Sequence, residues 1–422
     1  MGEHKGPMPR ETRNHVDDLR GATRLAVQAT RSVTNLVEAM HRTIGAGPAV
    51  LGRPLERPIR VLTAPVYAGI RGTTRLVGAG IDRALAGFGP LVPRRAPGKE
   101  FEAVLAAVNG VLGDYLAETR NPLAIRMGLY HGGQRLEIHR HALRAALPGA
   151  GRKLLVLVHG SCMNDAAWNH QGHDHGAALA RDLGYTQLYL RYNSGLHIST
   201  NGGELSGLLE RLVAEWPAAL DELVLLGHSM GGLVSRSACH VAETAGHRWR
   251  QQLTKLVCIA SPHHGAPLER GGSWVDALLG VSRYSRPLAS LGKIRSAGVT
   301  DLRFGYVLDE HWEGRDRFRL GTDRRTPLQL PEGVECYAIA GTRAPRPRPR
   351  LPDDGLVPVD SALGRHKKPE LTLAFPETHQ WIGFGIGHVE LLGRIEVYDV
   401  LRGWLSSRPR GHGARRRAAG SS

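Results

Sequence analysis

The chain lacks the features that mark membrane-spanning and secreted proteins. It has no run of about 18 or more consecutive apolar residues, and segment 1–20 is hydrophilic, so the sequence predicts neither a membrane span nor a secretory signal. Its four cysteines form no C-x-x-C pair, and three of them lie in or beside apolar runs. Buried free thiols in a reducing compartment are therefore expected, which favours a cytoplasmic protein. The four residues are Cys162, Cys239, Cys258 and Cys336.

Acidic residues are the second scarce class. Asp and Glu number 39 against 55 Lys and Arg, which gives a formal net charge of +16. The excess is local: residues 1–100 hold sixteen basic against eight acidic residues, the Arg-Pro stretch 342–350 adds four arginines, and the tail 406–422 adds five. A nearly neutral body argues against a nucleic-acid groove and indicates that the basic ends meet an acidic surface, of which an anionic lipid surface is one candidate. Solubility and a compositional bias are the alternative explanation.

The sequence does contain the motif Gly227-His228-Ser229-Met-Gly231, a G-x-S-x-G pattern. The motif follows the apolar run 223–226, typical of a strand buried on both faces, and precedes residues that fit a helix. A serine on a sharp strand-to-helix turn needs small neighbours, because only these let the two backbones approach, and Gly227 and Gly231 supply them. The pattern therefore predicts a nucleophile elbow that presents Ser229.

A nucleophilic serine needs a base, and an acid that orients the base. In sites of this kind the acid and then the base follow the serine along the chain. Asp354 lies in an acidic turn after an apolar strand and is the expected acid, with Asp353 as the alternative. His388 lies in a glycine-rich loop before the last helix and is the expected base, with His379 as its competitor. Position and order support this choice, because the chain has 21 histidines.

The developing oxyanion also needs backbone N–H donors. A second apolar strand ends in His159-Gly160, and an N–H just after such a turn is one donor in this kind of site. Ser161 is the expected donor there, with Cys162 as the alternative if the turn is one residue longer. Met230, the residue after the nucleophile, is the expected second donor.

With these pieces in order, the chain resembles the α/β-hydrolase superfamily, and within it the bacterial lipase and esterase branch that also looks like GPI inositol-deacylases. The resemblance extends from about residue 109 to 405 and implies a mostly parallel, about eight-stranded sheet with helices on both faces. It also implies a serine hydrolase that cleaves carboxylic esters through a Ser-His-Asp triad. The residues that carry it are His159-Gly160, Gly227 to Gly232, Ser261-Pro-His-His-Gly265 and Asp354-Gly-Leu-Val-Pro358.

The expected organisation has three parts. Residues 1–98 form a basic accessory region of two amphipathic helices, 99–407 form the α/β-hydrolase domain, and 408–422 form a disordered basic tail. Three roles of the two helices stay open: packing on the hydrolase domain, self-association, or binding to a lipid surface. Within the domain, 266–330 is the expected cap or lid, although an ordinary connecting region explains it equally well. The eight expected strands are 126–130, 135–139, 154–158, 186–192, 223–227, 254–260, 334–340 and 371–375.

The histidine-rich stretch 170–175 has spacing like that of metal ligands. A hydrogen-bonded loop at the rim of the site explains it better, because the stretch directly follows the first strand of the site. No metal and no cofactor are therefore expected.

The expected function is hydrolysis of acyl esters through an acyl-enzyme on Ser229. Two alternatives stay open. One is an acyltransferase that uses the same groups, and the other is a non-catalytic lipid-surface or granule-associated protein that binds through residues 1–98 and the basic tail.

Overall fold

A computed structural model describes residues 99–266, 296–316, 323 and 325–407. The predicted helical region 1–98 and the predicted tail 408–422 lie outside these ranges. Within them, residues up to 115 and from 125 onward belong to one compact body, which holds the sheet and the candidate site. Residues 116–124 are grouped apart from it and close a turn, in which the amide of Asn121 donates to the carbonyl of Leu116 at 2.8 Å.

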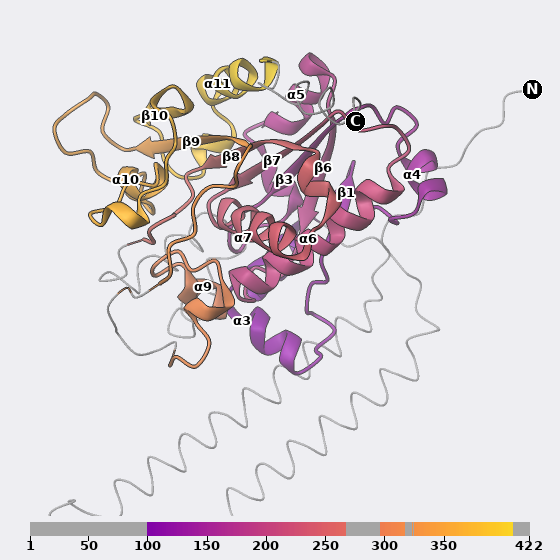
Figure 1. Cartoon of the computed structure of the whole chain (residues 1–422), viewed down its shortest axis with the longest axis horizontal. Coiled ribbons are helices and arrows are strands. Elements are labelled where there is room, and N and C mark those ends of the chain that lie inside the picture. Colours follow the sequence, from indigo (N-terminus) through magenta and orange to yellow (C-terminus); the bar gives the residue numbers. More distant parts are fainter. Residues whose placement is uncertain (1–98, 267–295, 317–322, 324, 408–422) are drawn as a thin grey trace, which may run out of the picture. The chain divides into compact units, whose positions relative to one another are not determined.

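An eight-stranded sheet forms the centre of the body (Figure 1). Five adjacent strands at the centre of this sheet run parallel, and so does the edge strand Gln380–Phe384. The antiparallel pairs of the sheet are those made by the strand Gly128–His131. The mostly parallel, eight-stranded sheet expected from the sequence is therefore confirmed. In spatial order the strands are β10 (Gln380–Phe384), β9 (Glu335–Thr342), β8 (Leu253–Ile259), β7 (Glu222–His228), β3 (Lys153–Val158), β6 (Thr186–Arg191), β1 (Gly128–His131) and β2 (Gln134–Arg135).

Two strand predictions are wrong. Of the expected strand 135–139 only Arg135 lies in a strand, β2, and residues 136–139 are outside the sheet. The sequence predicts the last strand over 371–375, but the edge strand is β10, Gln380–Phe384. Leu371, Leu373 and Phe375 are buried as an alternating pattern requires. The segment nevertheless pairs with a loop, since the amide of Leu373 donates to the carbonyl of Gly364 at 2.8 Å, and it never joins the sheet.

The helices cover both faces of the sheet. In β3, Leu154, Val156 and Val158 pack with apolar residues of α6 (Ile198–Glu215) and α7 (Met230–Ala245). Leu155 and Leu157 pack with those of α5 (His175–Leu183) and α11 (Ile395–Ser406). This alternation is what a strand buried on both faces requires. The α-helices are α3 (Lys99–Glu118), α4 (Arg140–Ala146), α5 (His175–Leu183), α6 (Ile198–Glu215), α7 (Met230–Ala245), α9 (Ala297–Asp301), α10 (Val359–Ala362) and α11 (Ile395–Ser406).

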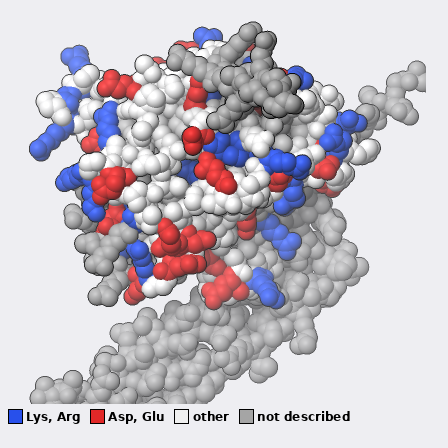
Figure 2. Space-filling view, in the orientation of Figure 1, with Lys and Arg blue, Asp and Glu red and all other residues white. Residues whose placement is uncertain are grey.

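Short elements complete the connections. The 3-10 helices are η3 (Asp165–Trp168), η4 (Arg248–Gln251), η7 (Asp309–His311), η8 (Pro369–Leu371), η9 (Glu377–His379) and η10 (Glu390–Leu392), and a small hairpin pairs β4 (Asn169–His170) with β5 (His173–Asp174). Basic and acidic side chains are interspersed over the face shown in Figure 2. No helix in the described ranges combines the length and apolarity needed to cross a bilayer.

A buried ion pair joins the amino ends of β7 and β8. The ammonium of Lys255, whose side chain is fully buried, donates to Glu222 Oε1 at 3.0 Å and to the carbonyl of Ser407 at 2.7 Å. The hydroxyl of Tyr185 donates to the same carboxylate oxygen at 2.9 Å. These bonds connect the sheet to the end of α11.

Replacing only one partner of this pair should be costly. We expect Lys255→Met to lower the free energy of unfolding by about 3–5 kcal/mol, because it leaves the carboxylate of Glu222 buried without a cation. The double variant Lys255→Met with Glu222→Gln should recover much of that loss. Guanidinium denaturation of the three proteins measures both effects. A single variant as stable as the wild type would contradict the expectation.

Candidate active site

Ser229 occupies a strained turn between β7 and α7. Its φ of 53° and ψ of −123° put a non-glycine residue in a backbone region that side chains rarely adopt. The turn is also crowded: a Cβ added to Gly231 would lie 2.1 Å from the carbonyl oxygen of Val158, and one added to Gly227 would lie 2.5 Å from the nitrogen of Gly232. The glycines of the motif are therefore required by space, as expected from the sequence.

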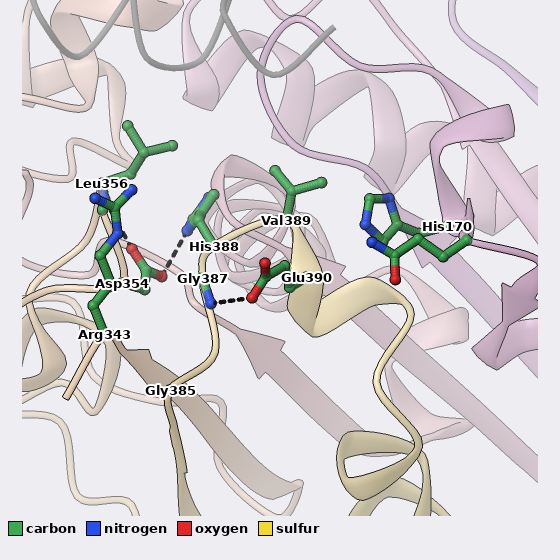
Figure 3. Close-up of a pocket in the computed structure, with 11 residues that line it drawn as sticks. His170, Arg343, Asp354, Leu356, Gly385, Gly387, His388, Val389 and Glu390 are labelled. Carbon is green, nitrogen blue, oxygen red and sulfur yellow. Dashed lines mark hydrogen bonds and ion pairs between the residues drawn. The ribbon is translucent and has the colours of Figure 1, made fainter. Parts of the chain in front are cut away.

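A buried hydrogen bond joins the expected acid and base (Figure 3). His388 Nδ1 donates to Asp354 Oδ2 at 2.7 Å, and the two side chains are 3% and 1% exposed. Asp354 Oδ1 accepts the amides of Leu356 and Val357 at 2.9 and 2.8 Å. Because Nδ1 carries the proton, Nε2 of His388 has a free lone pair. That Nε2 and the hydroxyl of Ser229 are both buried, and neither has a hydrogen-bond partner in the described part of the chain.

Asp353 and His379, the alternative acid and base, make other contacts. Asp353 Oδ1 accepts the amide of Gly355 at 3.0 Å and so shapes the turn. His379 Nδ1 donates to the carbonyl of Cys336 at 3.1 Å, and its ring stacks on Tyr337 with the centroids 4.1 Å apart. The structure therefore pairs Asp354 with His388 and leaves Asp353 and His379 out of the pair.

Two further histidines support the backbone around this pair. His228 Nε2 donates to the carbonyl of His388 at 3.1 Å, which ties the serine turn to the histidine loop. Burial, with a smaller contribution from His388, holds the pKa of His228 well below its usual range. Burial likewise lowers the pKa of His159 to about 4, and its ring stacks on Tyr192 with the centroids 4.4 Å apart. Both rings are therefore neutral near pH 7.

The hydrogen bonds of the backbone amides after β3 distinguish between the two candidate oxyanion donors there, Ser161 and Cys162. The amide of Cys162 donates to the hydroxyl of Ser194 at 3.0 Å and is thus occupied. Ser161 is fully buried beside it and is the remaining candidate. Met230 is the first residue of α7, where backbone N–H groups have no acceptor within the helix. Gly160 lies close by, since an added Cβ would be 3.1 Å from Cβ of Ser229.

A cavity of about 560 Å³ opens onto the Asp354 and His388 side of this arrangement. Charged and polar side chains line it, among them Arg343, Glu390 and His170 (Figure 3). Sequence reasoning missed Arg343 and Glu390 as residues of the site, whereas His170 belongs to the stretch that was expected at its rim. The position of Arg343 depends on the bond from its amide to the carbonyl of Asp353 at 3.1 Å, a long-range pairing that no local pattern indicates.

The histidine-rich stretch forms a hydrogen-bonded hairpin. His173 Nε2 and His175 Nδ1 lie 2.9 Å apart, and His175 Nε2 donates to the carbonyl of Leu391 at 2.9 Å. Asp174 caps α5 by accepting the amide of Ala177 at 3.0 Å. In the described ranges no three His, Cys, Asp or Glu side chains are grouped so that they could hold a metal ion. All four cysteines are free thiols, and Cys239, Cys258 and Cys336 are buried.

The predicted cap 266–330 is described only in part. Its described portion from 296 to 316 packs on the body, where Ser296 Oγ donates to the carbonyl of Gly110 at 2.6 Å and Trp312 stacks on His197 with the centroids 3.7 Å apart. Asp301 accepts the amide of Ile198 at 2.9 Å. Whether residues 267–295 form a lid lies outside the described residues.

The close approach at the serine turn can be tested with two glycine variants. We expect Gly231→Ala to lower the free energy of unfolding by about 3 kcal/mol, because its Cβ would overlap the carbonyl of Val158. Gly203→Ala, in α6, is the matched control: its Cβ would meet no atom within 4 Å, so the change should add about 0.5–1 kcal/mol. Chemical denaturation compares them, and equal effects would refute the crowding argument.

The chain is similar to one protein family and to several solved structures. Residues 156–323 match the family described as a PGAP1-like alpha/beta domain. No curated protein matches the chain in sequence. Among similar solved structures, a Bacillus licheniformis lipase in its mature form shows 16% identity over 61% of this chain and 93% of that chain, with a TM-score of 0.39. A Pyrococcus furiosus esterase shows 14% identity over 61% of this chain and 81% of that chain, with a TM-score of 0.35. Lipase 1 from Pelosinus fermentans shows 13% identity over 61% of this chain and 99% of that chain, with a TM-score of 0.34. The family match and the strand order together confirm that the described body has the α/β-hydrolase fold.

Proposed function

We propose that the protein hydrolyses carboxylic esters of acyl chains, with Ser229 as nucleophile, His388 as base and Asp354 as the acid that orients the base. The observation that supports this most is the buried 2.7 Å bond between Asp354 and His388, at the same edge of the sheet as the strained turn of Ser229. A carboxylate, an imidazole with a free Nε2 and an unpartnered hydroxyl are the three groups that such chemistry needs.

In the proposed mechanism, His388 Nε2 takes the proton of the Ser229 hydroxyl as the oxygen attacks the ester carbonyl. The negative charge that develops on the carbonyl oxygen is held by the amides of Ser161 and Met230. His388 then gives the proton to the leaving alcohol, and an acyl-enzyme remains. Water, activated by the same histidine, then attacks the acyl-enzyme, which releases the carboxylic acid product and restores the hydroxyl of Ser229. Asp354 stays ionised and stabilises the imidazolium.

The volume and lining of the cavity are suited to a small or medium-sized polar portion of an ester substrate. Its volume of about 560 Å³ is within the usual range for small-molecule sites. Arg343 and Glu390 at its edge suit the polar portion of an ester, and the acyl chain would then extend past Ser229. An acyltransferase would use the same groups with an alcohol in place of water. Contact with an anionic lipid surface through 1–98 and 408–422 stays a prediction outside the described residues.

Covalent labelling tests the nucleophile. We expect a fluorophosphonate probe to add one adduct to the full-length protein, mapped by peptide mass to Ser229, and p-nitrophenyl esters to be turned over. Ser229→Ala should lose the adduct and at least about 1,000-fold of the turnover while keeping the wild-type Tm. When a primary alcohol is added, a free carboxylic acid as product indicates hydrolysis, and a new ester of that alcohol indicates acyl transfer. A folded wild-type protein without the adduct would favour the non-catalytic alternative.

Two neighbouring aspartates give a matched test of the acid. We expect Asp354→Asn to lower kcat about 1,000- to 10,000-fold, because the amide cannot hold His388 in the required tautomer. Asp353→Asn keeps the turn acceptor and should change kcat less than about threefold. Steady-state kinetics with one p-nitrophenyl ester measures both. A larger loss in the Asp353 variant would mean that the acid is wrongly assigned.

A further inference from the structure

The turn after β3 contains a strained residue next to the candidate oxyanion donor. Ser161 and Cys162 lie in a turn shortly after the end of this strand. Cys162 has a φ of 59°, in the left-handed region that residues with a side chain rarely adopt. Such a conformation persists only where the surrounding structure holds it in place. The contacts of Cys162 therefore show what keeps this turn in shape.

The hydroxyl of Ser194 holds Cys162 from one side. The amide of Cys162 donates to Ser194 Oγ at 3.0 Å, and Ser194 is 1% exposed. Ser194 lies in the loop after β6, which is itself fixed by the side chain of Asn193. The amide nitrogen of that side chain donates to the carbonyl of Gly113 in α3 at 2.8 Å, and its oxygen accepts the amide of Gly195 at 3.1 Å. The acceptor for Cys162 is therefore part of a well-anchored loop.

Helix α3 packs against Cys162 from another side. A Cβ added to Gly110 would lie 2.2 Å from Sγ and 2.9 Å from Cα of Cys162. The helix approaches the loop of Ser194 just as closely, since a Cβ added to Gly195 would lie 2.2 Å from the carbonyl oxygen of Asn109. Close packing leaves little room for a side chain to move. The strained residue thus has α3 against it and the hydroxyl of Ser194 on its amide.

The shape of this turn determines the direction of the Ser161 amide. The peptide between Ser161 and Cys162 can rotate only if φ of Cys162 changes, and that rotation would break the bond to Ser194. The turn also lies beside the nucleophile, because a Cβ added to Gly160 would be 3.1 Å from Cβ of Ser229. A backbone donor is useful to an oxyanion only when it is held in place before the reaction.

We propose that Ser194 is a positioning residue of the active site: its hydroxyl keeps Cys162 in the left-handed conformation, and this keeps the amide of Ser161 directed at the carbonyl oxygen of the substrate. The inference rests on the proposed function, because the oxyanion belongs to that reaction. Ser194 acts through the backbone of Cys162 and takes no part in bond making or breaking.

Two buried serines give a matched kinetic test. We expect Ser194→Ala to lower kcat and kcat/KM for a p-nitrophenyl ester together, by about 10- to 100-fold, because the misplaced donor acts mainly in the transition state. Ser206→Ala removes a hydroxyl that is also buried, bonded to His247 at 2.8 Å and to Trp249 Nε1 at 3.2 Å. It should lower Tm but change kcat less than about threefold. Equal effects on kcat in the two variants would refute the positioning role.

A second substitution gives a readout that a purely structural role would not produce. Glycine adopts a positive φ without the penalty that Cys162 has. We therefore expect the double variant Ser194→Ala with Cys162→Gly to recover at least about fivefold of the lost kcat. If Ser194 only stabilised the fold, removing a further packed side chain would lower activity again. A double variant no more active than Ser194→Ala would contradict the proposal.

Crystal structures of the full-length wild type and of Ser194→Ala test the conformation without a kinetic assay. We expect Cys162 to leave the left-handed region in the variant, and an unchanged φ would overturn the proposal. Labelling by a fluorophosphonate separates the two possible failures. A wild type without an adduct on Ser229 would overturn the proposed function and the positioning role with it. A labelled wild type with undiminished kcat in Ser194→Ala would overturn the positioning role alone.

Discussion

The hydrogen bonds of one buried carboxylate hold the candidate site together. Asp354 accepts the amides of Leu356 and Val357 on one oxygen and His388 Nδ1 on the other. The two amide bonds form only when the turn after Asp354 folds back on itself, and the third bond sets the tautomer and place of His388. Because an unpaired buried carboxylate is costly, the turn, the acid and the histidine are stable only as a unit.

The parallel sheet places two buried polar clusters at opposite ends of its strands. Ser229, Asp354 and His388 follow the carboxyl ends of β7, β9 and β10, where loops are free to vary. The pair of Lys255 and Glu222 lies near the amino ends of β8 and β7. Between these ends the central strands are apolar on both faces. A substitution in the ion pair should therefore change stability without rearranging the acid and histidine.

Local chemistry explains which parts of this arrangement can be read from the sequence. Ser229 needs glycines on both sides, and parallel strands need continuous apolar runs, so both leave short-range patterns. β10, and not segment 371–375, pairs with the free edge of β9. The alternating burial of Leu371 and Leu373 contains no information about which segment reaches that edge. Arg343 reaches the cavity through a backbone bond to Asp353, which likewise leaves no local pattern.

Helix α7 connects the charge requirements of the molecule. Just before its start, burial keeps His228 neutral, so this ring adds no positive charge beside an imidazolium that forms on His388, whose counter-ion is Asp354. Further along the same helix, Arg236 keeps its charge in a buried position. Bonds from the His263 turn to Ser361 lead from Arg236 to α10 and hence to the turn of Asp354. A run of hydrogen bonds therefore links the buried guanidinium of Arg236 to the backbone that carries Asp354.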